Sequence, residues 1–324
     1  MSMTRRRTLG ALGAAASASP FLAAGAERRR DAHMRPLGIQ LYMLNGPLEQ
    51  DFQGTLTQLA AIGYREVEFA GFHNRTGAQL RAALDAAGLT CPSLHVPLEP
   101  MFPGMPSLQE PGEILKVMKA LGAAQVVVPS FLWPERFTRT LNMPELLRDM
   151  PRLAATLSQI AQQMTVEDWK TFARRLNETG SLLAKSGVHI GYHNHNLEFG
   201  RLGDSNPLEI LIRETDPALV SFELDVGWAA AAGVDPTAFL ARHAGRINQL
   251  HLKDVATVSP TGTLGMKSAD LGAGVIDWPR LLRAIRGARI AHLYVEQEEP
   301  FTTTPMDAAK AAFGFLQGRT ELYR

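Results

Sequence analysis

The segment GYHNHNLEF, residues 191–199, gathers side chains that commonly bind metals. His193, Asn194, His195, Asn196 and Glu198 follow directly on a short strand-like run, residues 188–190. Imidazole nitrogens and carboxylate oxygens are the usual protein ligands of Zn²⁺ and related divalent cations. By itself the segment predicts either half of a metal site or a polar loop that is rich in histidine.

Three further residues of the same chemical kind end predicted strands. Asp225 ends the run 220–225, His251 ends the run 247–251 and Glu296 ends the run 293–296. Taken singly, a strand-end aspartate is typically a helix N-cap, and a lone histidine is typically a hydrogen-bonded core residue. Together with the histidines of residues 191–199, they form a donor set that suits Mn²⁺, Zn²⁺, Co²⁺ or Fe²⁺. Without a cation, Asp225 and Glu296 would repel each other at close range.

The elements that must position these residues are short strands that alternate with amphipathic helices. The pattern predicts strands at residues 38–42, 66–69, 90–96, 124–129, 188–193, 219–225, 247–251 and 292–296. It predicts helices at residues 56–62, 79–87, 114–121, 169–185, 207–213, 237–243, 279–285 and 306–315. Eight such units in about 270 residues predict a single-domain (β/α)8 TIM barrel, whose chemistry lies where the strands end. An open doubly wound sheet is the alternative, but the first βα turn, residues 43–47, lacks the glycine pattern of that fold.

The connection after the fourth predicted strand is long. About 35 residues separate that strand from a helix whose N-cap is predicted at Thr165, which exceeds an ordinary βα loop. We therefore predict an extended loop that forms a lid or an added helical hairpin. Its aromatic residues Phe131, Trp133 and Phe137 either contact substrate or pack against the barrel rim.

The N-terminus has the pattern of an export signal. An arginine cluster, Arg5 to Arg7, precedes an Ala-rich stretch and a small-residue cleavage pattern that ends at Ala26. The motif resembles a twin-arginine (Tat) signal, and the apolar stretch is too short for stable membrane insertion. We predict a signal peptide at residues 1–26, a linker at residues 27–35 and the barrel at residues 36–324. The Tat machinery is then a partner and the protein is periplasmic or otherwise exported, whereas the alternative is a basic N-terminus on a cytoplasmic protein.

Charge and cysteine content exclude two further possibilities. Removal of residues 1–26 removes three arginines and no acid, so the formal net charge changes from +1 to −2. This balance argues against a nucleic-acid partner, which requires a concentrated basic surface. Cys91 is the single cysteine in the sequence, so no intramolecular disulfide forms. A homo-oligomer is compatible with the sequence.

Several segments in order carry a resemblance to a known family. The chain resembles the sugar phosphate isomerase/epimerase family of xylose-isomerase-like TIM barrels, a group that also includes endonuclease-IV-type enzymes. The resemblance extends over residues 36–300 and rests on AIGYREVEF (61–69), YHNH with EF (192–199), LDVGW (224–228), GRI with HLKD (245–254) and LGAGVIDW (271–278).

The resemblance implies one divalent metal ion, most often Mn²⁺, with Zn²⁺, Co²⁺, Fe²⁺ and Mg²⁺ also compatible. Carried over by position, the metal ligands are His193, Asp225, His251 and Glu296. Many members have glutamate where this chain has His193, and that glutamate is one of two acid/base groups. The difference puts a symmetric two-carboxylate mechanism in doubt, and His195 and Glu198 are rival ligands at this position.

The implied reaction is proton abstraction next to a carbonyl through an enediolate, which makes the protein an isomerase or epimerase. We predict that Glu296 removes the proton, that His195 or His193 returns it, and that Lys253 stabilises the oxyanion. Because phosphorylated sugars are scarce outside the cytoplasm, the expected small-molecule carbohydrate substrate is a free sugar, a keto-sugar or a glycoside.

Predicted substrate contacts lie nearer the rim of the barrel. The alternative for Lys253 is a salt bridge with Asp254 or Glu223. Trp228 lies just beyond Asp225, where its ring either stacks on a sugar ring or packs beneath the sixth loop. The predicted substrate-binding residues are Glu68, His95, Glu198 and Trp228.

Three other functions remain open at this point. A 3-keto-glycoside lyase or hydrolase that acts by β-elimination would use the same site. A non-catalytic periplasmic sugar-binding barrel would keep the loops and dispense with the metal. An endonuclease-IV-type nuclease would need more metal ligands and a basic groove, which the mature charge disfavours.

Overall fold

The computed structural model describes residues 35–319 and 322, apart from residues 102–103, 140 and 260–262. The predicted signal peptide and nearly all of the predicted linker lie outside the described residues. The described residues belong to one unit, Arg35–Arg324.

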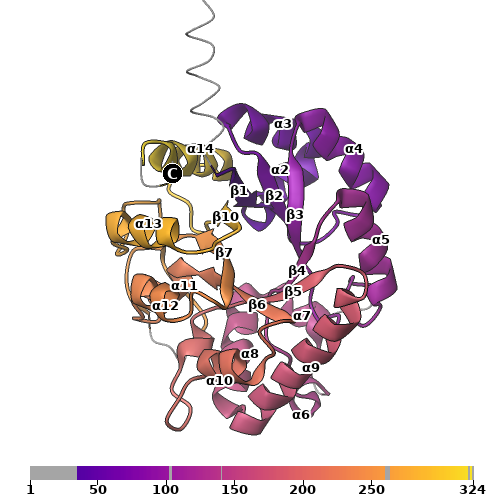
Figure 1. Ribbon diagram of the computed structural model, residues 1–324, viewed down its shortest axis with the longest axis vertical. Helices are drawn as coiled ribbons and strands as arrows, with labels where there is room; N and C mark the ends of the chain where they lie inside the picture. The colour runs from indigo at the N-terminus through magenta and orange to yellow at the C-terminus, as the bar shows by residue number, and fades with distance from the viewer. Residues whose placement is uncertain (1–34, 102–103, 140, 260–262, 320–321, 323–324) are drawn as a thin grey trace, which may run out of the picture. The chain divides into compact units, whose positions relative to one another are not determined.

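Eight parallel strands close into a barrel in the order β1, β10, β7, β6, β5, β4, β3, β2 (Figure 1). This confirms the predicted single-domain (β/α)8 TIM barrel. The strands are β1 (Leu37–Gln40), β2 (Glu66–Phe69), β3 (Thr90–His95), β4 (Gln125–Val128), β5 (His189–His193), β6 (Val220–Asp225), β7 (Ile247–Leu252) and β10 (His292–Val295).

Helices alternate with these strands on the outside of the barrel (Figure 1). All eight predicted helices are present. They are α3 (Phe52–Ile62), α4 (Gly77–Ala87), α5 (Pro111–Leu121), α9 (Val166–Ala184), α10 (Pro207–Glu214), α12 (Pro236–Arg242), α13 (Trp278–Gly287) and α14 (Pro305–Gln317).

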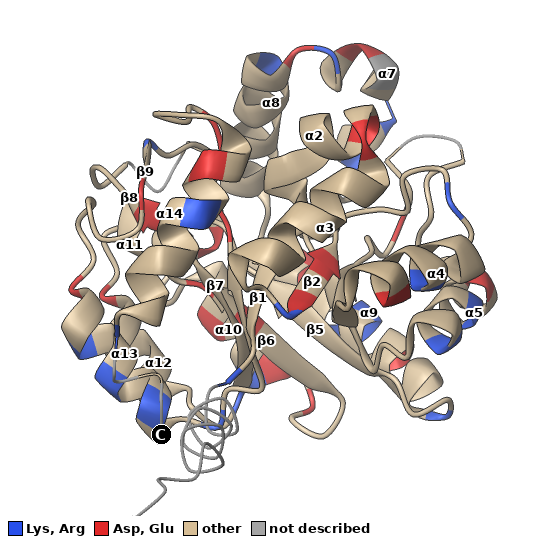
Figure 2. Cartoon of the chain, turned by 90° about the horizontal axis from the view of Figure 1, so that it is seen from above, with Lys and Arg blue, Asp and Glu red and all other residues tan. Residues whose placement is uncertain are grey.

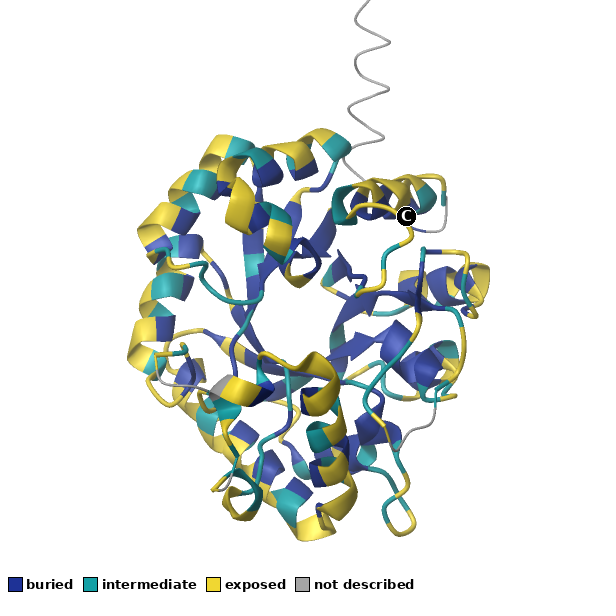
Figure 3. Cartoon of the chain, turned by 180° about the vertical axis from the view of Figure 1, so that it is seen from behind, coloured by how far each residue is buried: buried dark blue, intermediate teal, exposed yellow. Residues whose placement is uncertain are grey.

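Burial explains why these segments take these forms. The strand β4 reads QVVV and is buried at every position, as expected for a parallel strand covered on both faces. On α5, Ile114, Met118 and Leu121 are buried, and their spacing places them on one face of the helix. Figure 3 shows the same division throughout, with buried strands surrounded by helices that are buried on one side and exposed on the other.

Local turn chemistry follows the sequence as well. Gly88 and Gly122 end α4 and α5 in the left-handed region, with φ of 70° and 71°, where a side chain would be strained. The side chain of the predicted N-cap Thr165 accepts a hydrogen bond from the Asp168 backbone nitrogen. The Asp168 carboxylate in turn accepts one from the Thr165 backbone nitrogen, which completes a capping box.

The long connection after β4 contains three helices rather than a simple loop. They are α6 (Glu135–Thr138), α7 (Met143–Leu146) and α8 (Met150–Gln163). Phe131 is buried against Trp169 of α9, with ring centres 5.2 Å apart. The backbone nitrogen of Leu264 donates to Ser158 of α8 at 2.7 Å. The connection therefore packs on the barrel through part of its length.

Smaller elements lie at the carboxyl ends of the strands. They are η1 (Leu41–Leu44), α2 (Asn45–Gln50), η2 (Leu197–Phe199), α11 (Val226–Ala231) and an antiparallel pair, β8 (Asp254–Val255) with β9 (Ser268–Ala269). The periodicity of the sequence did not predict them because each is six residues or shorter.

Charged residues are distributed over the outer helices. Figure 2 shows Lys and Arg positions on α4, α5 and α13, with Asp and Glu positions between them. Every helix in the described part of the chain is too short or too polar to cross a bilayer.

Candidate functional site

The predicted metal ligands converge at the carboxyl ends of neighbouring strands. Asp225 of β6 and His251 of β7 are direct register partners. Each of His193, Asp225, His251 and Glu296 offers a ligand atom, and these four atoms all lie within 4.8 Å of one another. All four side chains are buried. The structure thus brings together the set that the sequence predicted, on four different strands or strand ends of the barrel.

The two carboxylate oxygens of Asp225 have different partners. Oδ1 accepts a hydrogen bond from the Trp228 backbone nitrogen at 2.8 Å and so caps helix α11. Oδ2 has no hydrogen-bond partner and lies 3.0 Å from the Lys253 ammonium. Burial raises the pKa of Asp225 to about 6, against the opposing effect of Lys253. The ordinary N-cap role and the ligand role are therefore compatible in one side chain.

Lys253 is a fully buried cation among acids. Its Nζ lies 3.0 Å from Asp225 Oδ2, 2.8 Å from Glu296 Oε2 and 2.7 Å from Glu298 Oε1. Burial would lower the pKa of Lys253, but these carboxylates raise it well above the usual value. Gly227 makes room for the lysine, since a Cβ there would lie 2.7 Å from Lys253 Cγ.

The alternative partners predicted for Lys253 were wrong. Asp254 instead fixes the segment 271–278, because its carboxylate accepts hydrogen bonds from the backbone nitrogens of Gly272 and Gly274 and from Trp278 Nε1. Glu223 faces the histidines rather than the lysine. These partners differ because the Lys253 side chain points, like that of His251, toward the mouth of the barrel, where both side chains reach Glu296.

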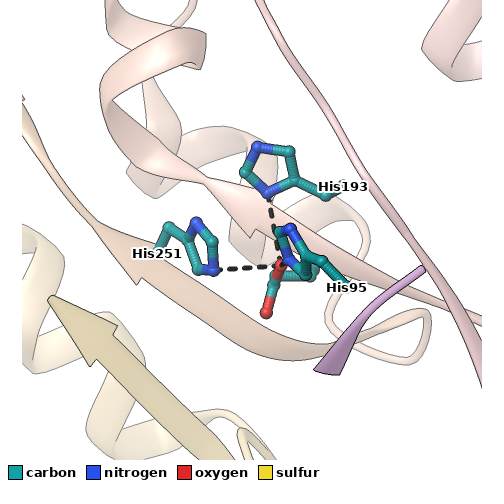
Figure 4. A group of neighbouring side chains, drawn as sticks. His95, His193 and His251 are labelled. Carbon is teal, nitrogen blue, oxygen red and sulfur yellow. Dashed lines mark hydrogen bonds and ion pairs between the residues drawn. The ribbon is translucent and has the colours of Figure 1, made fainter. Parts of the chain in front are cut away.

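A second group of imidazoles and carboxylates lies beside the first (Figure 4). Oε2 of Glu223 lies 2.8 Å from His95 Nε2, 3.2 Å from His193 Nδ1 and 3.0 Å from His251 Nε2. In Figure 4 the interactions of His193 and His251 meet at one carboxylate oxygen. Sequence reasoning did not assign Glu223 a role in the site. The available signal was strand alternation, which places Glu223 on the same face as Asp225.

His251 links the two groups through its two ring nitrogens. Nδ1 lies 2.9 Å from Glu296 Oε2, and Nε2 lies 2.8 Å from Glu68 Oε2. Burial would lower the pKa of His251, but Glu223 and Glu296 raise it well above the usual value. When Nε2 donates its proton to Glu68, Nδ1 is left as the lone-pair nitrogen that faces Asp225 and Glu296, which is how carboxylates orient metal-binding histidines.

Two predicted substrate contacts belong to this buried network. Glu68 is fully buried and accepts hydrogen bonds from Gln40 Nε2 at 2.8 Å and from Ser93 Oγ at 2.5 Å. The His95 side chain is 8% exposed. Burial opposes protonation of His95, but the carboxylates of Glu68 and Glu223 outweigh it and raise the pKa to about 9.

The remaining predicted residues form the wall of the site. Glu198 is buried outside the ligand group, where it accepts hydrogen bonds from the Tyr192 hydroxyl and, at 3.1 Å, from the His195 backbone nitrogen. The His195 side chain is 26% exposed and its ring centre lies 5.2 Å from that of Trp228. The Lys253 ammonium lies 5.2 Å from the centre of the buried Trp228 ring. His195 is thus the more accessible imidazole of the HNH segment.

A cavity lies between the loops after β3 and β4. Its volume is 150 Å³, and its apolar lining includes Leu98, Phe131, Trp133 and Met143, with Glu99 and Ser130 as polar members. Its lining includes none of the predicted ligands His193, Asp225, His251 and Glu296.

The donor chemistry of the site fits a divalent metal. Asp225 and Glu296 supply carboxylates and His251 supplies Nδ1, while Oδ2 of Asp225 is buried without a hydrogen bond. Two carboxylates with one or two imidazoles form a common coordination set for Mn²⁺, Fe²⁺ and Zn²⁺.

Fold and site together define a TIM-barrel protein with a polar, ligand-rich centre at the carboxyl ends of its strands. The model of the xylose isomerase-like TIM barrel family matches residues 56–318. The chain therefore belongs to the xylose isomerase-like TIM barrel family.

Relatives and solved structures agree with this assignment. An inosose dehydratase of Bacillus anthracis is 24% identical over 290 residues, which cover 85% of this chain and 91% of the relative. The rhizopine catabolism protein MocC of Rhizobium meliloti is 25% identical over 288 residues, or 82% of this chain and 79% of that protein. A sugar phosphate isomerase/epimerase from Parabacteroides distasonis superposes with a TM-score of 0.65 at 23% identity, covering 89% and 95% of the two chains. A probable 3-DHS dehydratase, AsbF, from Bacillus anthracis superposes with a TM-score of 0.61 at 12% identity, covering 88% and 99%. At these identities the solved structures support the fold alone.

Proposed function

We propose that the protein is a divalent-metal-dependent enzyme that removes a proton next to the carbonyl of an uncharged carbohydrate and acts as an isomerase or epimerase. The observation that carries this proposal is the placement of Glu296. Its carboxylate lies within 2.9 Å of His251 Nδ1 and 2.8 Å of the Lys253 ammonium, at the mouth of the barrel. A base, a candidate metal centre and a buried cation are thus adjacent, as this reaction requires.

The metal would be held by Asp225, His251 and Glu296, with His193 as the fourth candidate ligand. We expect Mn²⁺ first, with Zn²⁺, Co²⁺, Fe²⁺ and Mg²⁺ as alternatives. When bound, such an ion would polarise the carbonyl and stabilise the developing negative charge by several kcal/mol.

Residues of the chain carry out the proton transfers and stabilise the oxyanion. Glu296 accepts the proton, and the Lys253 ammonium stabilises the oxyanion because it is buried and already desolvated. His195 returns the proton, since it is the partly exposed imidazole next to the ligand cluster. Trp228 closes the wall behind both groups.

Two observations support an uncharged substrate. The glycine-containing segment 271–278 is unavailable to phosphate at Gly272 and Gly274, because Asp254 already accepts their backbone N–H groups. The same carboxylate would repel a phosphate at this place. The proposed export signal at residues 1–26 agrees with a free sugar, keto-sugar or glycoside.

β-Elimination is the second candidate function. It is supported by relatives named inosose dehydratase and by His193, which stands where a two-carboxylate mechanism would need a second glutamate. In this reaction Glu296 takes the proton from one carbon, the carbon–oxygen bond at the β-carbon breaks, and His195 protonates the departing oxygen. A hydroxyl leaves as water, and a glycosidic group leaves as its alcohol.

The decisive variant is Glu296→Gln. The metal-loaded protein in heavy water, tested with a panel of sugars and 3-keto-sugars, should incorporate solvent deuterium next to the carbonyl. Glu296→Gln should lower that incorporation by about 10²-fold or more, as expected for loss of a general base. Glu299→Gln, an exposed change three residues away, is the matched control and should retain exchange.

The products decide between the two candidates. A recovered isomer or epimer supports the first, and an unsaturated product with loss of water or alcohol supports the second. Undiminished exchange in Glu296→Gln would show that another group is the base. Exchange that persists in chelator, with no metal in the protein, would refute the metal-dependent mechanism, and carbohydrate binding without any exchange would identify a binding barrel.

A further inference from the structure

Three imidazole nitrogens converge on a single carboxylate oxygen of Glu223. Oε2 lies within 3.2 Å of three ring nitrogens, those of His95, His193 and His251. One carboxylate oxygen offers about two lone pairs. Its neighbour Oε1 is already an acceptor for Gln249 Nε2 at 3.0 Å. Because His251 Nε2 also reaches Glu68 Oε2, at 2.8 Å, His95 Nε2 and His193 Nδ1 remain as the two ring nitrogens that converge on this buried oxygen.

The same positions suit ligands around a cation. Bonds of about 2.0–2.1 Å to one ion place neighbouring ligand atoms roughly 2.9–3.4 Å apart, for angles between a right angle and a tetrahedral one. His95 Nε2 and His193 Nδ1 lie 2.8 and 3.2 Å from Glu223 Oε2, close to that range. These atoms and His251 lie within 4.8 Å of one another.

The charge of the surrounding cluster also calls for a second cation. In the described part of the chain, the two neighbouring groups together contain five carboxylates and one ammonium group, that of Lys253. We call Asp225, His251 and Glu296 the outer group. One divalent ion bound there leaves two uncompensated negative charges, and protonation of His95 would offset one of them. A second divalent ion offsets both, which matters because buried unpaired charge costs several kcal/mol. The five carboxylates are those of Glu68, Glu223, Asp225, Glu296 and Glu298.

We propose that the barrel holds a second divalent cation on His95 Nε2, His193 Nδ1 and Glu223 Oε2, which we call the inner site. The outer metal keeps Asp225, His251 Nδ1 and Glu296. The Nε2–H of His251 donates to Glu68, so no imidazole has to bridge two metals. Two imidazoles and one carboxylate suit Zn²⁺ and leave a coordination position free for water or a substrate oxygen. The inner site rests on these contacts, whichever reaction follows.

The test counts metal ions. The full-length protein is stripped with chelator and dialysed against excess Zn²⁺, and bound zinc per chain is measured by mass spectrometry. We expect two equivalents. His95→Gln and Glu223→Gln should each bind one equivalent, and Asp225→Asn should also bind one. His292→Gln is the matched control, because His292 pairs with Glu66 at the opposite end of β10 from Glu296, and it should bind two.

Circular dichroism and unfolding midpoints establish that each variant is folded before its zinc is counted. One equivalent in the wild type, lost in Asp225→Asn and kept in His95→Gln, would overturn the inner site and leave the proposed function intact. One equivalent lost in His95→Gln and kept in Asp225→Asn would overturn the outer assignment instead. No bound metal in the wild type would overturn both. If Glu223→Gln and His95→Gln are both folded and each loses one equivalent of zinc, the result supports the inner site rather than a change of fold.

Discussion

At the scale of single residues, Lys253 decides the electrostatics of the outer group. It is fully buried and contacts Asp225, Glu296 and Glu298. Three carboxylates that converge without a cation would repel one another, so the ammonium stabilises the site before any metal binds. A divalent ion on Asp225 and Glu296 would take over part of this role and free the ammonium for an oxyanion.

This double role predicts the behaviour of Lys253→Met. Removal of one partner from a buried ion-pair cluster costs about 3–5 kcal/mol, so the free energy of unfolding of the metal-free protein should fall by that amount. Added Mn²⁺ or Zn²⁺ should restore more stability in the variant than it adds to the wild type, because the ion supplies the missing charge. Urea unfolding with and without metal measures both effects.

The matched control is Lys185→Met. Lys185 is exposed at the end of α9, and such a surface change should alter stability by no more than about 0.5 kcal/mol. If Lys253→Met were as mild as this control, or if metal added equal stability to the variant and the wild type, Lys253 would not be the cation that compensates these acids.

At the scale of elements, a charged contact ties the added helices to the barrel. Arg136 of α6 donates two hydrogen bonds, each 2.6 Å long, to the two carboxylate oxygens of Asp168 in the first turn of α9. The same carboxylate completes the capping box with Thr165. The hydrogen bonds from Arg136 lower the pKa of Asp168 from 3.8 to about 2.

The contact should therefore make stability depend on pH in a defined window. A carboxyl group whose pKa is lower in the folded state stabilises the protein above its unfolded pKa, near 4, and this contribution is lost as the pH falls through about 2. Arg136→Gln should lower the stability modestly at pH 6, because the Arg136 side chain is 48% exposed and solvent screens the ion pair. The cost should shrink toward zero near pH 2.

Denaturant unfolding of both proteins at several pH values measures this difference. Arg139→Gln is the control, since Arg139 contacts Glu135 of its own helix, and both of those side chains are mostly exposed. A cost for Arg136→Gln that stays constant from pH 6 to pH 2 would contradict the assigned role of Asp168.

At the scale of the whole molecule, the fold carries few requirements that depend on its compartment. Cys91 is the single cysteine in the sequence and is buried, so the barrel needs no disulfide and its stability comes from the core and the barrel hydrogen bonds. Such a protein is able to fold, and to acquire a metal, before it is exported. This suits the proposed Tat signal at residues 1–26.

Export gives a prediction for the intact chain. In a bacterial host with twin-arginine machinery, the wild type should be recovered from the periplasm with Glu27 as its first residue. Replacement of Arg5, Arg6 and Arg7 by lysine should leave the uncleaved protein in the cytoplasm. The same replacement at Arg28, Arg29 and Arg30, beyond the cleavage point, should not. An uncleaved wild type in the cytoplasm would refute the signal. Cell fractionation and intact mass measure each outcome.

The sequence by itself determined the elements and their order. Short, largely apolar runs predicted the eight barrel strands, because a strand buried on both faces is mostly apolar, as the three valines of β4 are. Glycines such as Gly88 marked the helix ends, because only glycine takes that backbone conformation without strain. Strand-end positions then pointed to Asp225, His251, Glu296 and the histidines of residues 191–199, since the strands of such a barrel end on one face. The family resemblance selected His193 among those histidines.

The tertiary structure alone decided which partner each functional side chain has. Lys253 directly follows β7 and Glu223 lies on β6, two strands that the sequence located correctly. Their contacts nevertheless depend on side-chain direction across the closed barrel. Lys253 therefore meets Asp225 and Glu296 rather than Asp254, and Glu223 meets three histidines from three other strands. Periodicity reports the face on which a residue lies, but the distance between residues 128 positions apart, such as His95 and Glu223, exists only once the barrel has closed.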